Sequence, residues 1–124
     1  MENNSDKLIL IVDDSADNQE LLKIVLISKG YNVQCASNGR EALEMLLELS
    51  VLPNLILLDA RMPVMDGYEF RAQQSKNERI KNIPVLVMTG DSDERMGKQM
   101  NEPCGILVKP LRLNTVIEAV LLHV

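Results

Sequence analysis

The hydrophobic residues of this chain gather in short runs, and each run ends in polar or turn-forming residues. Four such runs cover residues 8–12, 55–58, 85–88 and 106–108. Apolar runs of this length, bounded by turn signals, are typical of strands that are buried on both faces of a parallel sheet. Between them, apolar residues recur every three or four positions, which predicts helices with one buried face. The pattern therefore predicts strands and helices that alternate along the chain.

Helices with clear apolar stripes and one further strand extend this order. The first helix follows Asp14 and ends at Lys29 and Gly30, where glycine permits the left-handed backbone of a helix C-terminus. A shorter, less apolar strand is expected over residues 32–36. The other helices are marked by apolar residues at 42, 43, 46 and 47, by the segment from Tyr68 to about Lys76, and by apolar residues at 113, 116, 117, 120 and 121.

The segment from residue 91 to residue 105 is expected to form only a short, weak fourth helix. Its first residues are acidic, which suits a helix N-terminus. Gly97 in the middle costs about 1 kcal/mol relative to alanine. Pro103 ends any helix that forms.

This order predicts an α/β fold of five strand–helix units, with helices on both faces of a parallel sheet because the crossovers are right-handed. Rossmann-like and flavodoxin-like strand orders compete for such a pattern. The first strand is not followed by G-x-G-x-x-G, and five units suit the shorter fold. We therefore expect a flavodoxin-like (βα)5 three-layer sandwich whose five-stranded sheet has the order 2-1-3-4-5. No linker or repeat interrupts the chain, so residues 1–124 are expected to form one domain.

Reactive side chains follow the predicted strands where each strand ends. They are Asp13 and Asp14 after the first strand, Asp59 after the third, Thr89 after the fourth and Lys109 after the fifth. Because ligands of an open parallel sheet bind outside the carboxyl ends of its strands, we expect these five residues to meet at one edge. Two like charges 4 Å apart repel by about 4 kcal/mol at an effective dielectric of 20, so clustered carboxylates call for a cation. Oxygen ligands from few side chains suit Mg²⁺.

A metal site beside an ammonium group indicates phosphoryl chemistry. The ammonium of Lys109 and the hydroxyl of Thr89 can both donate to phosphoryl oxygens. A carboxylate can act as a nucleophile and form an acyl phosphate, and phosphoryl transfer depends mainly on positioning and charge neutralisation. The strand ends therefore predict a site for a divalent cation and a phosphoryl group.

Composition narrows the classes of function. The 13 basic and 18 acidic residues give a net charge of −5, which does not favour nucleic-acid binding, since phosphate contacts need clustered basic residues. No apolar stretch reaches the roughly 18–20 residues that span a bilayer, and the polar first residues lack a signal-peptide core. We therefore expect a cytoplasmic protein. Cys35 and Cys104 lack metal-like spacing and are expected to be reduced, Cys35 in a strand and Cys104 in a loop.

The five strand-end residues together resemble the receiver domain of two-component response regulators, the CheY-like family. The resemblance rests on Asp13-Asp14, Asp59, Thr89 and Lys109-Pro110 in this order and spacing, and on the loop over residues 59–67. It covers about residues 7–122. A lone pair of aspartates is common, whereas five such positions at the ends of four predicted strands are jointly specific.

The resemblance implies a role for each residue at the acidic end of the site. Asp59 would be the phosphoacceptor, taking a phosphoryl group from the phosphohistidine of a histidine kinase. Asp14 and Asp59 would bind Mg²⁺ directly, together with the backbone carbonyl of Arg61. Asp13 would help to hold the metal through water.

The resemblance also implies how the signal is passed on. Thr89 would hydrogen-bond a phosphoryl oxygen and carry the switch, Lys109 would pair with the phosphoryl group, and the Lys109–Pro110 bond is often cis in the family. The partners would be a histidine kinase or phosphotransfer protein, and a downstream protein bound at the face of the fourth helix, fifth strand and fifth helix. Direct nucleic-acid or membrane binding is not expected. Such a domain is a switch with slow self-phosphorylation and self-dephosphorylation, not a turnover enzyme.

One position departs from the family pattern. The family usually places an aromatic residue three positions before the conserved lysine, where this chain has Ile106. Isoleucine has no hydroxyl and is stiff at χ1, so a pseudo-receiver with atypical or phosphorylation-independent output stays open as the alternative. Met96 and Met100 are expected to pack on the sheet, or to form an adaptable partner surface with Ile106. A haloacid-dehalogenase-type hydrolase is disfavoured, because Arg61 stands where that class has a second aspartate.

Two further expectations concern the loops beside the site. Arg61 and Asp91 have opposite charge at the rim of the site, and we hypothesise that they restrict or steer the water that attacks the phosphorylated carboxylate. Asp66-Gly67 is expected to form a tight turn that needs a positive φ at Gly67.

Overall fold

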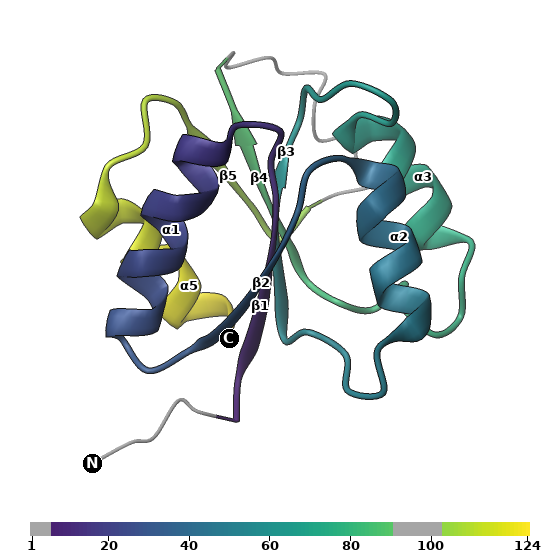
Figure 1. Cartoon of the computed structure of the whole chain (residues 1–124), viewed down its shortest axis with the longest axis horizontal. Coiled ribbons are helices and arrows are strands. Elements are labelled where there is room, and N and C mark those ends of the chain that lie inside the picture. Colours follow the sequence, from purple (N-terminus) through teal and green to yellow (C-terminus); the bar gives the residue numbers. More distant parts are fainter. Residues whose placement is uncertain (1–5, 91–102) are drawn as a thin grey trace.

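In the computed structural model, which describes residues 6–90 and 103–124, a five-stranded parallel sheet lies between two layers of helices (Figure 1). The strands are β1 (Leu8–Val12), β2 (Asn32–Ala36), β3 (Leu55–Asp59), β4 (Val85–Thr89) and β5 (Gly105–Val108). Their order across the sheet is β2-β1-β3-β4-β5, and every neighbouring pair is parallel. The predicted flavodoxin-like order is therefore confirmed.

The helices divide between the two faces of the sheet. They are α1 (Ala16–Ser28), α2 (Gly39–Glu48), α3 (Gly67–Ser75) and α5 (Leu113–His123). Figure 1 shows α1 and α5 on one face and α2 and α3 on the other. The fourth helix that the sequence predicts falls on residues 91–102, which lie outside the described part of the chain. Within the described ranges, no helix is long and apolar enough to cross a bilayer.

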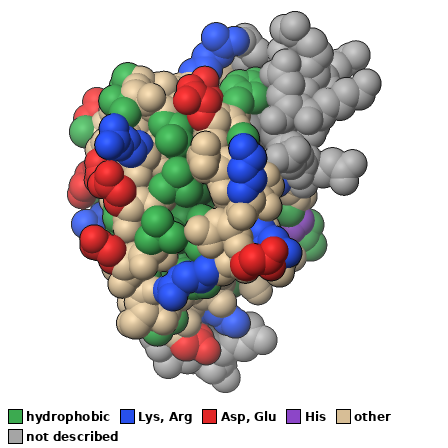
Figure 2. All heavy atoms as spheres, turned by 90° about the vertical axis from the view of Figure 1, so that its right-hand side faces the viewer, with side chains coloured by type: hydrophobic (Ala, Val, Ile, Leu, Met, Phe, Trp, Pro, Cys, Tyr) green, Lys and Arg blue, Asp and Glu red, His purple; other side chains and the backbone are tan. Residues whose placement is uncertain are grey.

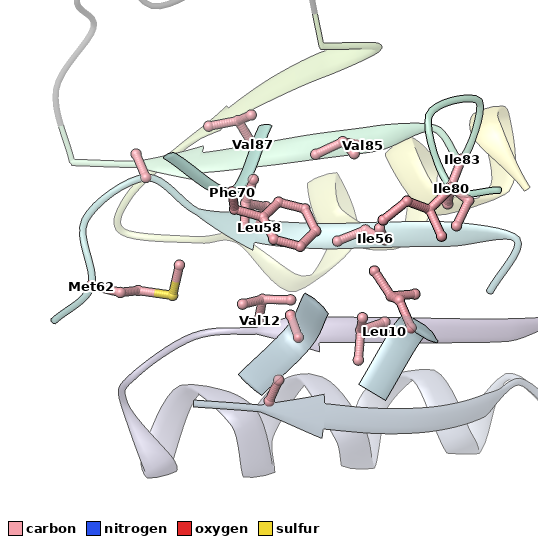
Figure 3. Packing of buried hydrophobic residues seen from close by; sticks show 14 residues of the cluster. Leu10, Val12, Ile56, Leu58, Met62, Phe70, Ile80, Ile83, Val85 and Val87 are labelled. Atoms are coloured by element: carbon pink, nitrogen blue, oxygen red, sulfur yellow. The ribbon is translucent and has the colours of Figure 1, made fainter. Parts of the chain in front are cut away.

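Two hydrophobic cores lie on opposite faces of the sheet. Successive side chains of a strand point to opposite faces, so each central strand supplies both cores. Figure 3 shows the core beneath α2 and α3, in which Phe70 packs among alternate residues of three strands. Those strand residues are Leu10, Val12, Ile56, Leu58, Val85 and Val87. The intervening residues, such as Ile11 and Leu57, pack against α1 and α5 instead, which explains why these strands appear in the sequence as unbroken apolar runs.

Short polar side chains begin three of the four described helices. Ser15 accepts a hydrogen bond from the backbone N–H of Asn18 at α1. Asn38 and Asp66 cap α2 and α3 in the same way, each accepting from the N–H three residues later. Each cap satisfies one of the N–H groups that a helix leaves without an internal partner. At the other end of α1, Gly30 has φ 91°, as the sequence predicts.

The loop between β3 and α3 differs from the prediction. Gly67 does not make a turn of positive φ, because Asp66 is the N-cap and Gly67 already begins α3. The residue of positive φ in this loop is Val64, at 68°. Gly67 instead donates its backbone N–H to the carbonyl of Ala60 over 3.0 Å, which ties the start of α3 to the end of β3. The expectation for Gly67 was therefore wrong.

The outer surface of α2 is partly apolar. Figure 2 views the face covered by α2 and α3, where hydrophobic side chains run down the middle and charged side chains lie on both sides. Leu47 on α2 is 55% exposed. A charge can therefore be introduced at Leu47 without entering either core.

A buried amide holds the chain between α3 and β4. The side chain of Gln74 is fully buried and donates through Nε2 to the carbonyls of Ile80 and Ile83, over 2.9 and 3.1 Å. Its Oε1 accepts from Nη1 of the buried Arg71 over 2.6 Å. Replacing Gln74 therefore leaves two carbonyls and a guanidinium without this partner inside the protein.

We expect Gln74→Met to lower the free energy of unfolding by about 3 kcal/mol, because the substitution removes three buried hydrogen bonds that each contribute roughly 1 kcal/mol. Gln73→Met is the matched control, since Gln73 is exposed on the same helix and should change stability by less than about 0.5 kcal/mol. Urea unfolding of the two variants measures the difference. Equal stabilities for the two would contradict a structural role for the Gln74 contacts.

Candidate functional site

The sheet register brings the predicted site residues to one edge. Asp59 and Thr89 are the last residues of β3 and β4. Asp13 follows β1, and Lys109 follows β5. Within the described ranges, Asp13, Asp14 and Asp59 form a group whose ligand oxygens all lie within 4.8 Å of one another. The expected convergence of carboxylates at the carboxyl ends of the strands is therefore present.

Lys109 reaches this group from the end of β5, which is an edge strand of the sheet. Its Nζ lies 3.0 Å from Oδ2 of Asp59 and 4.0 Å from Oδ2 of Asp13. Its backbone N–H donates to the carbonyl of Thr89 over 2.6 Å, which fixes the start of the loop after β5 to the end of β4. The Lys109–Pro110 peptide bond is cis, as expected from the resemblance. The Lys109 side chain is 28% exposed, so it is partly shielded from water and not fully enclosed by protein.

Asp13 is buried and held by neighbouring donors. Its Oδ1 accepts the backbone N–H of Ser15 over 2.9 Å, and its Oδ2 accepts Nδ2 of Asn18 over 3.4 Å. Burial raises the pKa of the Asp13 carboxyl, and the charge of Asp59 acts in the same direction. The Ser15 N–H and the Lys109 charge act in the opposite direction. A cation beside Asp13 would act in the same direction as Lys109, because positive charge favours the charged form of a carboxyl group.

Asp59 has a partner for each carboxylate oxygen. Oδ2 accepts from Lys109, and Oδ1 accepts the backbone N–H of Arg61 over 3.2 Å. The residue is 5% exposed, whereas Asp14 beside it is exposed. One side of the carboxylate group is thus enclosed by protein, and the Asp14 side opens to solvent.

The donor set fits a small divalent cation. The three carboxylates supply oxygen ligands, and the exposed position of Asp14 leaves room for water in the coordination shell. Mg²⁺ typically binds one or two carboxylates and keeps several waters. The carbonyl of Arg61 as a further ligand stays a prediction. Thr89 is 2% exposed at the end of β4, and its role toward a phosphoryl group also stays a prediction.

The remaining predicted positions lie outside the carboxylate group. Ile106 on β5 pairs in register with Val87 and is 45% exposed. Asp91, Met96 and Met100 lie outside the described residues. Cys35 is half-buried on β2 as expected, and both described cysteines are free thiols.

Two residues of the site were not recognised in the sequence. The side chains of Asn18 and Gln19, in the first turn of α1, both contact Asp13. Gln19 lies three and seven residues before Leu22 and Leu26, which form the buried stripe of α1. The sequence did contain a signal for Gln19, because its amide continues the apolar stripe of α1 into the first helical turn. That turn lies over the end of β1, where the site is.

Comparison with known proteins identifies the family. A family model described as "Response regulator receiver domain" matches residues 9–121. The chain is 38% identical over 85 residues to the sensor histidine kinase CheAY of Helicobacter pylori, a match that covers 68% of this chain and 11% of the relative. It is 36% identical over 115 residues to the autoinducer 1 sensor kinase/phosphatase LuxN of Vibrio campbellii, covering 92% of this chain and 13% of the relative. The chain therefore spans a small part of these relatives.

Solved structures show the same fold over most of their own length. The chemotaxis response regulator CheY4 of Vibrio cholerae superposes with a TM-score of 0.85 at 30% identity, covering 95% of this chain and 98% of that one. The response regulator TrrA of Thermotoga maritima, solved in complex with Mg²⁺ and BeF, has a TM-score of 0.83 at 30% identity, covering 95% and 99%. With its strand order and carboxylate group, this chain belongs to the response regulator receiver domain family.

Proposed function

We propose that this chain is a phosphorylation-controlled switch in which Asp59 accepts a phosphoryl group from the phosphohistidine of a histidine kinase or phosphotransfer protein. The observation that carries the proposal is the pairing of Asp59 with Lys109 at 3.0 Å, beside two further carboxylates. Attack by an Asp59 oxygen forms the O–P bond as the N–P bond breaks, and the imidazole keeps the electron pair of that bond. Such transfer depends mainly on positioning and charge neutralisation.

The residues divide this task between them. Asp14 and Asp59, with the carbonyl of Arg61, would hold Mg²⁺ directly, and Asp13 would hold it through water. The bound ion supplies positive charge beside the transferred phosphoryl oxygens. Lys109 supplies a second positive charge beside Asp59, and the Thr89 hydroxyl would donate to a phosphoryl oxygen. The buried carboxylate of Asp13 is kept in place by Ser15 and Asn18.

The output is a change of partner binding and not a turnover reaction. Phosphorylation shifts the populations of the loops that follow β3, β4 and β5, because those loops meet the phosphoryl group. The downstream protein would bind a face that includes β5 and α5, where Ile106 and Val108 are 45% and 52% exposed. Because Ile106 has no aromatic ring or hydroxyl, the alternative is an interaction module whose partner binding does not follow phosphorylation.

The phosphodonor would dock beside Lys109. A pocket of about 210 Å³ lies between α1 and the start of α5, and it is lined by Asn18, Leu21, Leu22, Lys109, Pro110, Leu111 and Leu113. Leu21 at this pocket is 47% exposed. The pocket offers an apolar surface that continues to the ammonium beside Asp59, so a protein held there would present its phosphohistidine to the carboxylate.

We expect Asp59→Asn to abolish phosphorylation by acetyl phosphate and Mg²⁺, because an amide cannot replace the carboxylate nucleophile. Mass spectrometry of the intact protein measures the gain of phosphate. An acid-labile, hydroxylamine-sensitive phosphate on the Asn variant would contradict the assignment of Asp59. If the unmodified chain gains phosphate and its partner binding stays the same, the phosphorylation-independent alternative is supported.

Lys109→Met should change metal binding and phosphorylation in opposite directions. Removing the ammonium from the carboxylates should tighten Mg²⁺ binding several-fold, since a competing positive charge is lost. Phosphorylation at saturating Mg²⁺ should slow by about 100-fold, the usual cost of removing one stabilising group from a charged transition state. Titration of backbone amide chemical shifts with Mg²⁺ and timed acetyl phosphate labelling measure the two effects. A variant that loses Mg²⁺ binding would show that Lys109 only maintains the geometry of the site.

Leu21→Glu should weaken docking of the donor without changing the chemistry. We expect phosphoryl transfer from a purified, phosphorylated histidine-kinase core to slow by about tenfold, as for loss of an apolar interface anchor. Labelling by acetyl phosphate should keep its rate, because Asp59 and Lys109 are unchanged. Leu47→Glu is the control, since Leu47 is similarly exposed on the opposite face of the sheet. Equal rates of protein-to-protein transfer for both variants would exclude docking at this pocket.

A further inference from the structure

We propose that Gln19 is a positioning residue for metal binding: its side-chain amide holds the peptide between Asp13 and Asp14, and so sets the separation of the two carboxylates. This inference rests on the proposed Mg²⁺ site and adds to it a residue that is not a metal ligand. Gln19 is half-buried in the first turn of α1, directly over the end of β1.

The Nε2 group of Gln19 faces three oxygen atoms that can accept a hydrogen bond. Nε2 lies 2.5 Å from the carbonyl oxygen of Asp13, 3.3 Å from that of Ala36 and 3.5 Å from Oγ of Ser37. The amide thus acts as a donor toward the ends of β1 and β2. A side chain without N–H groups cannot replace it there.

These contacts hold Asp13 from both sides of its backbone. The N–H of Asp13 donates to the carbonyl of Ala36 over 3.0 Å, and the carbonyl of Asp13 accepts from Gln19. The peptide that joins Asp13 to Asp14 is therefore fixed at the point where the chain leaves the sheet. Rotation of that peptide would move both carboxylates, since one aspartate lies on each side of it.

The hold matters because the carboxylates repel one another. Their ligand oxygens lie within 4.8 Å of each other, so the cluster would spread if the peptide were free to turn. A cation binds most tightly when its ligands already lie at the required separation. Hydrogen bonds that orient metal ligands from outside the coordination shell typically contribute 10- to 100-fold to metal affinity.

Two substitutions separate hydrogen bonding from charge. Gln19→Met keeps the length of the side chain and its helix propensity but removes the donors. Gln19→Lys keeps donors and adds a positive charge, which opposes Mg²⁺. If donation to the carbonyls matters, the unmodified chain should bind Mg²⁺ most tightly, Gln19→Lys less tightly and Gln19→Met least tightly. If only the local charge matters, Gln19→Met should bind Mg²⁺ as tightly as the unmodified chain, and Gln19→Lys should bind it more weakly than both.

The experiment is a Mg²⁺ titration of the full chain, followed by backbone amide chemical shifts. We expect Gln19→Met to raise the Mg²⁺ Kd at least about tenfold. The Kd of Gln19→Lys should lie between that of Gln19→Met and that of the unmodified chain. Acetyl phosphate labelling of the Met variant should need correspondingly more Mg²⁺ and then reach the normal rate. Gln73→Met, an exposed position on α3, is the control and should keep the normal Kd.

The outcomes distinguish the inference from the function on which it rests. An unmodified chain that does not bind Mg²⁺ would overturn the proposed function itself. If the unmodified chain and Gln19→Met bind Mg²⁺ equally, the proposed function stands and the role of Gln19 in metal binding is overturned. This holds even if Gln19→Met has a lower melting temperature, because a purely structural role would also lower it. A Lys variant that binds more weakly than the Met variant would also overturn it, in favour of a charge effect.

Discussion

The repulsion among three carboxylates is the constraint on which the functional edge of this protein depends. Asp13 and Asp59 are almost fully buried, where the cost of a charge is highest and water cannot screen it. The structure offsets this cost with the ammonium of Lys109 and with backbone N–H groups of two loops. Among the described residues the arrangement is nevertheless short of positive charge, because one lysine ammonium lies beside three carboxylates. A divalent cation would restore the balance, and with that cation in place the edge could also accept the negative charge of a phosphoryl group.

Much of the fold and of the site could be predicted because both follow from simple periodicity. Strands buried on two faces appear as unbroken apolar runs, and a residue that directly follows such a run must lie at the sheet edge. This reasoning placed Asp59, Thr89 and Lys109 correctly. The same reasoning did not find Gln19, because the contacts of a helix residue with a strand end are known only once the helix has been placed over the sheet. Gly67 was misplaced because the Asp-Gly pair suits a turn and a capped helix start equally well.

In the proposed function, the chemistry and the output lie on neighbouring but different parts of the sheet. The carboxylates lie at the ends of β1 and β3 in the middle of the sheet, where each of these strands has a neighbouring strand on both sides. Ile106 belongs to β5 at the edge, where its side chain is 45% exposed. A central strand can change little without disturbing both cores, whereas an edge strand has a free side. The proposed chemistry can therefore be retained while the surface proposed to report it changes.

The two-sided burial of β1, β3 and β4 has a consequence for how the sheet assembles. Sliding such a strand by one residue exchanges its faces, yet places apolar side chains on both of them again. The apolar pattern alone therefore discriminates weakly between pairing registers. The charged residues at the strand ends help to determine the register. If β1 or β3 slid so that its end entered the sheet, Asp13 or Asp59 would lie in a hydrophobic core at a cost of several kcal/mol. The acids that form the candidate metal site thus also mark where each strand must stop.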